Sequence, residues 1–275
     1  MSPLSNKEFI GFPPGLLLDR PLKAPIIAEV KEWIALNKPS GIAIRQHPWN
    51  VDISDNMDAA LNRQLQAQKP ELVKGGAILF GSVYNLDPEI SGVSLFAKQK
   101  DSLRELRNFV GSEKLQFKFL LVAKTDRSIA TDEIVADAPL LIHNTKPKMI
   151  PSTAKGKKAR THFRQIHESS LGWSLWEAST RFPRLHQIRA HATAEGIAVL
   201  GDSLYAGPDV PSLSELMPRK RTAETCKPIF DGIALHLNEV LLPIPAENSR
   251  ATSLNATIPK QFKLLLKRLQ LEYSK

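Results

Sequence analysis

The segment from residue 115 to residue 123 constrains the fold of this chain more than any other. Its odd positions are all apolar and include Phe117 and Phe119, whereas its even positions begin with Gln116 and Lys118. A period of two residues is typical of a β-strand. Shorter apolar runs recur along the chain, and turn residues such as Gly and Pro separate them. We therefore predict an α+β fold, with a mixed, largely antiparallel β-sheet flanked by helices.

The other elements are predicted from apolar periodicity and from residues that begin or end helices. Residues 1–24 contain several prolines and show no period, so we expect an irregular N-terminal arm before a single domain over residues 25–275. Helices are expected after Asp55, from Asp101 or Ser102 to Gly111, over 184–191 and over 259–271. Strands are expected at 26–30, 33–37, 42–45, 77–83, 93–97, 159–166, 173–178 and 197–200.

Composition limits the class of protein. The 275 residues are 42% hydrophobic and 24% charged, as expected for a globular protein of one large or two modest domains. No stretch approaches 18 apolar residues, and residues 1–20 lack the pattern of a signal peptide, so we predict a cytoplasmic protein without membrane association. The single cysteine, Cys226, cannot form an internal disulfide.

Basic residues are unevenly distributed. The chain has a net charge of +9, and a basic linker, residues 144–165, carries seven Lys and Arg residues and no acid. Lys157 and Lys158 lie at its centre. Such a cluster attracts polyanions, of which nucleic acid is the commonest. A solvated linker with no partner is the alternative interpretation.

One acidic residue, Asp87, stands between two apolar runs. The run 77–83 leads into a loop, and Gly92 begins the next run. A carboxylate held between strands, with Pro88 directly after it, is placed rigidly enough to act as a nucleophile. An Asp-Pro pair that only opens a turn is the alternative.

Several chemical signatures are absent from the sequence. It contains no phosphate-binding loop of the Walker type, no dinucleotide fingerprint and no His-Glu-x-x-His motif. His186 and His191 are five positions apart, which does not place them on one helical face. We therefore expect neither a metal nor a cofactor.

Four ordered blocks resemble the RluA-type pseudouridine synthases. Asn85-Leu86-Asp87, with Ser91-Gly92 and Leu95-Phe96-Ala97-Lys98, resembles the catalytic stretch of that family. The other blocks are Asn37-Lys38-Pro39-Ser40-Gly41, His186-Gln187-Ile188-Arg189-x-His191 and Gly201-Asp202-x-Leu204-Tyr205. Together the matches span roughly residues 33–245, and four blocks in order are far more specific than one.

The resemblance implies an isomerase. Such an enzyme breaks the C1′–N1 bond of a uridine in RNA, turns the uracil over and rejoins it through C5. Asp87 would be the essential carboxylate, either adding to the sugar or removing a ribose proton, and Arg189 would pair with it and keep it ionised. Without the resemblance, Arg189 reads as an arginine at a helix end that binds carbonyl groups.

The resemblance also implies a set of substrate-binding residues. Phe119 would stack on the uracil, although packing in the core is its alternative role, and the two roles are compatible. The full predicted set is Phe119, Asn85, Tyr84, His186, Gln187, Lys38, Lys157 and Lys158. The expected partner is structured RNA, either rRNA or tRNA, and the expected enzyme is a monomeric, stand-alone catalytic domain without an S4-type RNA-binding domain.

The chain departs from the family pattern at several positions. The family usually has His-Arg-Leu-Asp, so Asn85 replaces the arginine that helps to displace the target base, and Phe119 replaces the usual tyrosine. Asp87 and Arg189 remain. A catalytically impaired RNA-binding or RNA-folding homologue is therefore the second hypothesis. A glycosidase of free nucleosides is a third, in which the basic residues would have no purpose.

Overall fold

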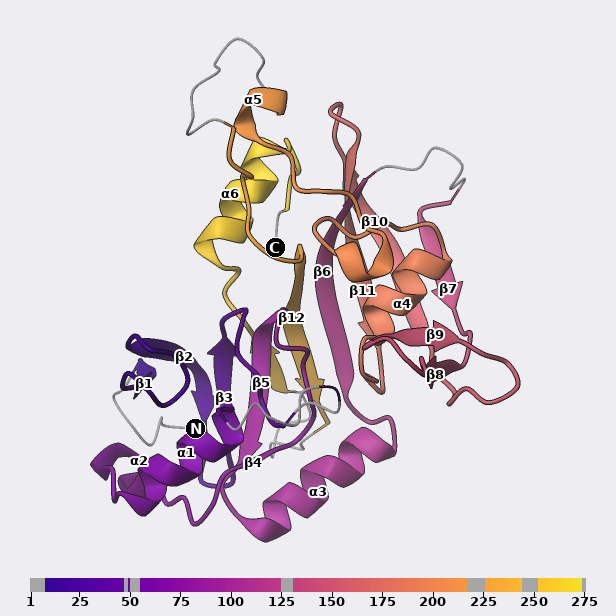
Figure 1. The fold of residues 1–275 in the computed structure, drawn as a ribbon. Helices are drawn as coiled ribbons and strands as arrows, with labels where there is room; N and C mark the ends of the chain where they lie inside the picture. The colour runs from indigo at the N-terminus through magenta and orange to yellow at the C-terminus, as the bar shows by residue number, and fades with distance from the viewer. Residues whose placement is uncertain are drawn as a thin grey trace. The chain divides into compact units, whose positions relative to one another are not determined.

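A computed structural model describes residues 8–46, 49, 55–124, 131–216, 226–243 and 252–273 (Figure 1). The chain divides into two compact units. Unit 1 contains residues 1–118, 180–185 and 237–257, and unit 2 contains residues 119–179, 186–236 and 258–275. Each unit is made of several chain segments and is described by itself, and the expectation of a single domain over residues 25–275 stays a prediction.

The sheet of unit 1 has the strand order β1-β2-β3-β5-β12, with β4 paired to β5 and β13 paired to β12. Antiparallel registers join β1 to β2, β2 to β3, β3 to β5, β4 to β5 and β12 to β13. The strands are β1 (Phe9–Phe12), β2 (Leu22–Glu29), β3 (Trp33–Lys38), β4 (Gly81–Ser82), β5 (Ser91–Ala97), β12 (Leu235–Leu242) and β13 (Thr252–Asn255). Residues 237–242 of β12 belong to this unit.

Strand β5 lies at the centre of unit 1 and is buried along its whole length. Ser94, which alternates with apolar residues, is buried too, and its hydroxyl donates to the carbonyl oxygen of Leu36 at 3.1 Å. The first residues of the strand pair in register with β3, Gly92 opposite Lys38 and Val93 opposite Asn37. The loop that precedes β5 is therefore fixed to the end of β3.

The described residues of unit 1 form the helices α1 (Met57–Gln66), α2 (Pro70–Lys74) and α3 (Lys100–Gly111). Helix α1 is capped by Asn56, whose side chain accepts from the amide of Ala59 at 3.0 Å, and not by the predicted Asp55. Helix α3 ends at Gly111 as predicted and packs on β5, with Leu106 and Val110 buried.

Unit 2 is built on a sheet with the order β6-β11-β10-β7 and a separate two-stranded sheet, β8-β9. Helix α4 packs on β7, β9 and β10. The strands are β6 (Gln116–Lys124), β7 (Glu133–Ala136), β8 (Leu140–Ile142), β9 (Met149–Pro151), β10 (Thr161–Glu168) and β11 (Trp173–Thr180). Residues 119–124 of β6 and 173–179 of β11 belong to this unit. The helices are α4 (Gln187–Ala194), the 3₁₀ turn η1 (Ser203–Tyr205), α5 (Leu213–Leu216) and α6 (Lys260–Arg268).

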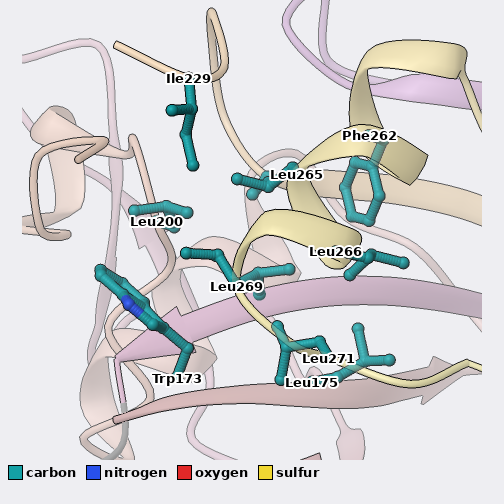
Figure 2. Close-up of a cluster of buried hydrophobic side chains, with 11 residues drawn as sticks. Trp173, Leu175, Leu200, Ile229, Phe262, Leu265, Leu266, Leu269 and Leu271 are labelled. Atoms are coloured by element: carbon teal, nitrogen blue, oxygen red, sulfur yellow. The ribbon is translucent and has the colours of Figure 1, made fainter. Parts of the chain in front are cut away.

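Helix α6 closes a hydrophobic cluster in unit 2 (Figure 2). Its apolar stripe, Phe262, Leu265, Leu266 and Leu269, is buried against side chains that include Trp173. This stripe has the spacing that the sequence indicates for an amphipathic helix. The predicted C-terminal helix is therefore present, over Lys260–Arg268.

Several expected elements differ in the structure. The arm is not irregular throughout, because β1 pairs with β2 and buries Ile10 and Phe12; residues 1–7 lie outside the described residues. Residues 42–45 form no strand, since the carbonyls of Ala43 and Ile44 accept from the first amides of α1. The run 77–83 is a strand only at Gly81–Ser82.

Two further expectations in unit 2 are corrected. Residues 197–200 make a single bridge, Val199 to Ala123, in place of a strand. The basic linker is partly ordered as sheet, because it contains β9 and the start of β10. Its Lys157 exchanges both backbone hydrogen bonds with Leu140, at 2.8 and 2.9 Å.

Gly92→Ala is expected to destabilise the fold. Gly92 has φ +132°, and a Cβ atom there would lie 2.2 Å from the carbonyl oxygen of Leu237. Backbone strain alone costs about 1–3 kcal/mol, and the clash adds to it. Gly11→Ala is the matched control, since nothing lies within 4 Å of its added Cβ. Urea unfolding should show a lower midpoint for Gly92→Ala only; equal midpoints would contradict this.

Candidate active site

Asp87 lies in the loop that joins β4 to β5 in unit 1. The side chain is only 4% exposed, and the neighbouring Leu86 and Ile90 are buried as well. The amide of Ile90 donates to the carbonyl of Asp87 at 3.0 Å and closes a turn around Pro88. The loop is thus anchored by apolar residues on both sides of the carboxylate.

Lys38 ties this loop to the end of β3. Its side chain is fully buried, and Nζ donates to the carbonyl oxygens of Pro39, Ile42 and Pro88 at 3.1, 2.8 and 3.0 Å. An ammonium group has three donors, and all three are engaged within the protein. Lys38 therefore positions the Asp87 loop, and its predicted contact with substrate stays a prediction.

Burial also changes the acidity of Lys38. Desolvation lowers the pKa of its ammonium from 10.5 to about 7, and attraction to Asp87 and Glu89 opposes this shift. A cation whose charge responds to pH near neutrality thus lies within electrostatic range of Asp87.

Tyr84 holds the segment before Asp87. Its hydroxyl donates to the carbonyl of Val93 in β5 at 2.9 Å, and its ring meets Phe117 edge to face at 4.8 Å between centroids. Burial raises the pKa of Tyr84 well above 10, so the phenol stays protonated. These contacts brace the loop; the predicted contact of Tyr84 with substrate stays a prediction.

Asp87 lines a pocket of about 570 Å³ within unit 1. Its wall includes the predicted Asn85, which is half-buried, and two residues that sequence reasoning missed, Arg45 and Arg107. The apolar part comes from α3 and from the segment 180–185, including Phe182. Pockets of this size, with an apolar wall and a few polar groups, are typical sites for small ligands or a single nucleoside.

Arg189 is the centre of a buried network in unit 2. The arginine is 2% exposed, and its Nε and Nη2 atoms donate to the two carboxylate oxygens of Asp202 at 2.7 and 2.8 Å. The Tyr205 ring lies 5.0 Å from the guanidinium carbon. Asp202 was present in the fourth sequence block but carried no predicted role. The predicted pairing of Arg189 with Asp87 stays a prediction.

His186 and Gln187 position the start of α4. The Nε2 atom of His186 lies 3.2 Å from Nη1 of Arg189, and its Nδ1 atom lies 3.1 Å from the Tyr205 hydroxyl. Gln187 donates to the carbonyl of Arg160 at 2.9 Å and to Thr161 Oγ1 at 3.1 Å. Both side chains are at least 95% buried. Their predicted contacts with substrate therefore remain predictions beside an observed structural role.

Three other predicted residues of unit 2 are Phe119, which is buried, and Lys157 and Lys158, which are exposed. Phe119 is 3% exposed in β6, as the core-packing alternative expects, and its stacking on uracil stays a prediction. Lys157 and Lys158 are exposed, which leaves their side chains accessible to a polyanion. Among the described residues, no group of three His, Cys, Asp or Glu side chains could hold a metal ion.

The sequence model of the RNA pseudouridylate synthase family matches residues 32–194, more than half of the chain. This chain belongs to that family. The match contains Lys38, Asp87 and Arg189.

Individual relatives agree with the assignment. The dual-specificity RNA pseudouridine synthase RluA of Yersinia pestis is 29% identical over 191 residues, covering 69% of this chain and 85% of that protein. An uncharacterized RNA pseudouridine synthase of Chloroflexus aurantiacus is 23% identical over 236 residues, covering 85% of this chain and 66% of that protein.

A solved structure supports the fold. Human RNA Pseudouridylate Synthase Domain Containing 4 has a TM-score of 0.66 at 20% identity, covering 91% of this chain and 94% of that chain. The predicted RluA-like resemblance, the α+β fold class and the isomerase class are confirmed. No helix in the described part of the chain is long and apolar enough to span a membrane.

Lys38→Met is expected to remove a pH dependence of stability. The pKa of Lys38 is lowered in the folded state, so between pH 7 and 10.5 the unfolded chain binds more protons and stability should rise with pH. The rise from one such group is at most about 1.4 kcal/mol per pH unit. Urea unfolding at pH 7 and pH 9 should show this gain for the wild type and for Lys100→Met, which changes an exposed lysine, but not for Lys38→Met. Equal gains in all three proteins would contradict the assignment.

Proposed function

We propose that this protein isomerises uridine to pseudouridine in structured RNA, either rRNA or tRNA, with Asp87 as the essential catalytic carboxylate. The observation that carries the proposal is a buried aspartate, fixed by Lys38 and Tyr84, at the wall of a pocket large enough for one nucleoside. The family assignment supplies the reaction, and the names of the relatives support RNA as the substrate.

The reaction conserves every atom of the base. The C1′–N1 bond breaks, the uracil turns within the pocket, and a C1′–C5 bond forms. The proton lost from C5 is balanced by the proton gained at N1. Asp87 assists departure of the base either by adding to the sugar or by removing a ribose proton, and an ionised carboxylate can do both.

Arg189 supplies the second charge in the proposal. It is held by a bidentate pair with Asp202, by His186 and by the face of Tyr205, so its guanidinium has one orientation. We infer that this fixed guanidinium pairs with Asp87 in the catalytic state and keeps the carboxylate ionised.

RNA binding is assigned to the exposed basic residues of unit 2. To reach C1′, the enzyme must take a nucleotide out of its stack, at a cost of a few kcal/mol. Contacts to phosphates offset this cost, and Lys155, Lys157 and Lys158 are accessible for such contacts. We further infer a cytoplasmic monomer that needs neither a metal nor another cofactor.

Asp87→Asn is expected to abolish isomerisation. The amide has almost the same shape, but it carries no charge and is a poor nucleophile. Asp101→Asn is the matched control, because Asp101 is exposed and pairs with Arg104 in the same helix. RNA from cells that lack the gene, incubated with each purified protein, should gain pseudouridine with Asp101→Asn and gain none with Asp87→Asn, as measured by liquid chromatography of the nucleosides with tandem mass spectrometry, which separates the two isomers. Full activity of Asp87→Asn would refute the role of the carboxylate.

Arg189→Lys is expected to lower the rate at least a hundredfold with a smaller effect on RNA affinity. A lysine keeps the charge but cannot make the bidentate pair with Asp202, so the cation loses its fixed orientation. Arg164→Lys, at an exposed pair with Glu177, is the control and should keep its rate. Single-turnover rates and filter-binding affinities separate the two effects. A wild-type rate in Arg189→Lys would show that the orientation is unimportant.

A further inference from the structure

The pocket beside Asp87 contains two arginines from distant parts of unit 1. Arg45 follows the turn at Gly41, and Arg107 lies in α3. Both line the same pocket, and the electrostatic field of Arg107 is felt at Arg45. Two positive charges repel each other, so the pocket without an anion carries an unfavourable electrostatic energy.

Arg107 is held in place by the backbone. Its Nε and Nη2 atoms donate to the carbonyl oxygen of Ser82 in β4 at 3.2 and 2.8 Å. These two hydrogen bonds use one edge of the guanidinium group, and the donors of its Nη1 atom can bind a ligand. The guanidinium is therefore oriented before any ligand arrives.

Asp58 lies within electrostatic range of both arginines, but its carboxylate is hydrogen-bonded elsewhere. Asp58 accepts from the amide and the hydroxyl of Ser82 at 2.8 and 2.7 Å, one bond to each carboxylate oxygen. Within the part of the chain that the structure describes, neither arginine forms an ion pair with Asp58 or with another carboxylate. Two guanidinium groups thus line the pocket together with the carboxylate of Asp87.

The pKa shifts of Arg45 and Asp58 agree with this arrangement. Partial burial, followed by repulsion from Arg107, lowers the pKa of Arg45, whereas Asp58 opposes the shift. Burial raises the pKa of Asp58. An anion that entered the pocket would relieve the repulsion between the arginines. Both side chains remain accessible from solvent, so such an anion can reach them.

We propose that Arg45 and Arg107 form a subsite for the phosphodiester that adjoins the target uridine. The inference rests on the proposed function, because the same pocket holds Asp87 and an apolar wall for the base. Arginine binds phosphate oxygens through two parallel hydrogen bonds, and the pre-oriented Arg107 is suited to this geometry. The subsite fixes the nucleotide by its backbone while the base remains able to turn.

The test measures the affinity for a fluorescein-labelled pentauridylate at several salt concentrations. All proteins carry Asp87→Asn, so that no turnover complicates binding. In this background, Arg45→Gln and Arg107→Gln should each weaken binding about tenfold. Each should also reduce the slope of log K against log salt by about 0.7, the value for one phosphate contact on a single strand. Arg45→Lys keeps the charge and should keep the slope.

Two controls define the result. Arg104→Gln changes an exposed arginine of α3 that pairs with Asp101, and it should leave affinity and slope unchanged. A pentauridylate with uncharged methylphosphonate linkages should bind the arginine variants and their parent equally. Folding is checked by thermal melting, and both arginines lie at the surface, where a change to glutamine is tolerated.

The outcomes separate the subsite from the proposed function. If Arg45→Gln and Arg107→Gln show the same slope as Arg104→Gln, the subsite is refuted, even when the wild type isomerises RNA. If the slopes fall as stated but the wild type isomerises no RNA, the subsite stands as an RNA contact and the proposed catalytic function fails.

Discussion

Three hydrogen bonds from one buried ammonium group hold the loop on which the proposed chemistry depends. Lys38, at the end of β3, donates to Pro88 in this loop and to Pro39 and Ile42 in the segment after β3, so it ties the two segments together next to Asp87. Burial of an ammonium group is costly unless its donors are satisfied. The fold meets this condition for Lys38 with backbone carbonyls.

The same principle organises unit 2. Arg189 is buried and is compensated by a bidentate carboxylate, a histidine and an aromatic face. Removing one partner from such a network leaves a buried charge without compensation, which is strongly destabilising. In both units, then, a buried cation is fixed by short-range contacts before substrate binds, and electrostatic preorganisation of this kind is a large contribution to catalysis.

The sequence predicted the parts of the fold that depend on local pattern. The alternating segment 115–123 is β6, and the apolar stripe after Pro259 is α6. The sequence-based predictions were wrong where tertiary contacts determine the secondary structure. Residues 42–45 have a strand-like composition, but their carbonyls bind the first turn of α1. Asp55 and Asn56 are both good caps, and only the backbone conformation selects Asn56.

The candidate site shows the same division. Asp87 and Arg189 could be proposed as site residues because they stand in ordered motif blocks. The role of Lys38 could not, because a motif names a residue without showing whether its side chain faces the substrate or the backbone. Arg45 and Arg107 have no common motif, and only the packing of α3 against β5 brings them to one pocket.

The most direct test of the central claim is pseudouridine mapping of total RNA, by carbodiimide labelling and primer extension, in cells with and without this gene. The account predicts that at least one pseudouridine in rRNA or tRNA disappears on deletion and that a uridine takes its place. If every pseudouridine persists, the protein does not act as an RNA isomerase in the cell, and an RNA-binding role becomes the better explanation of its charge.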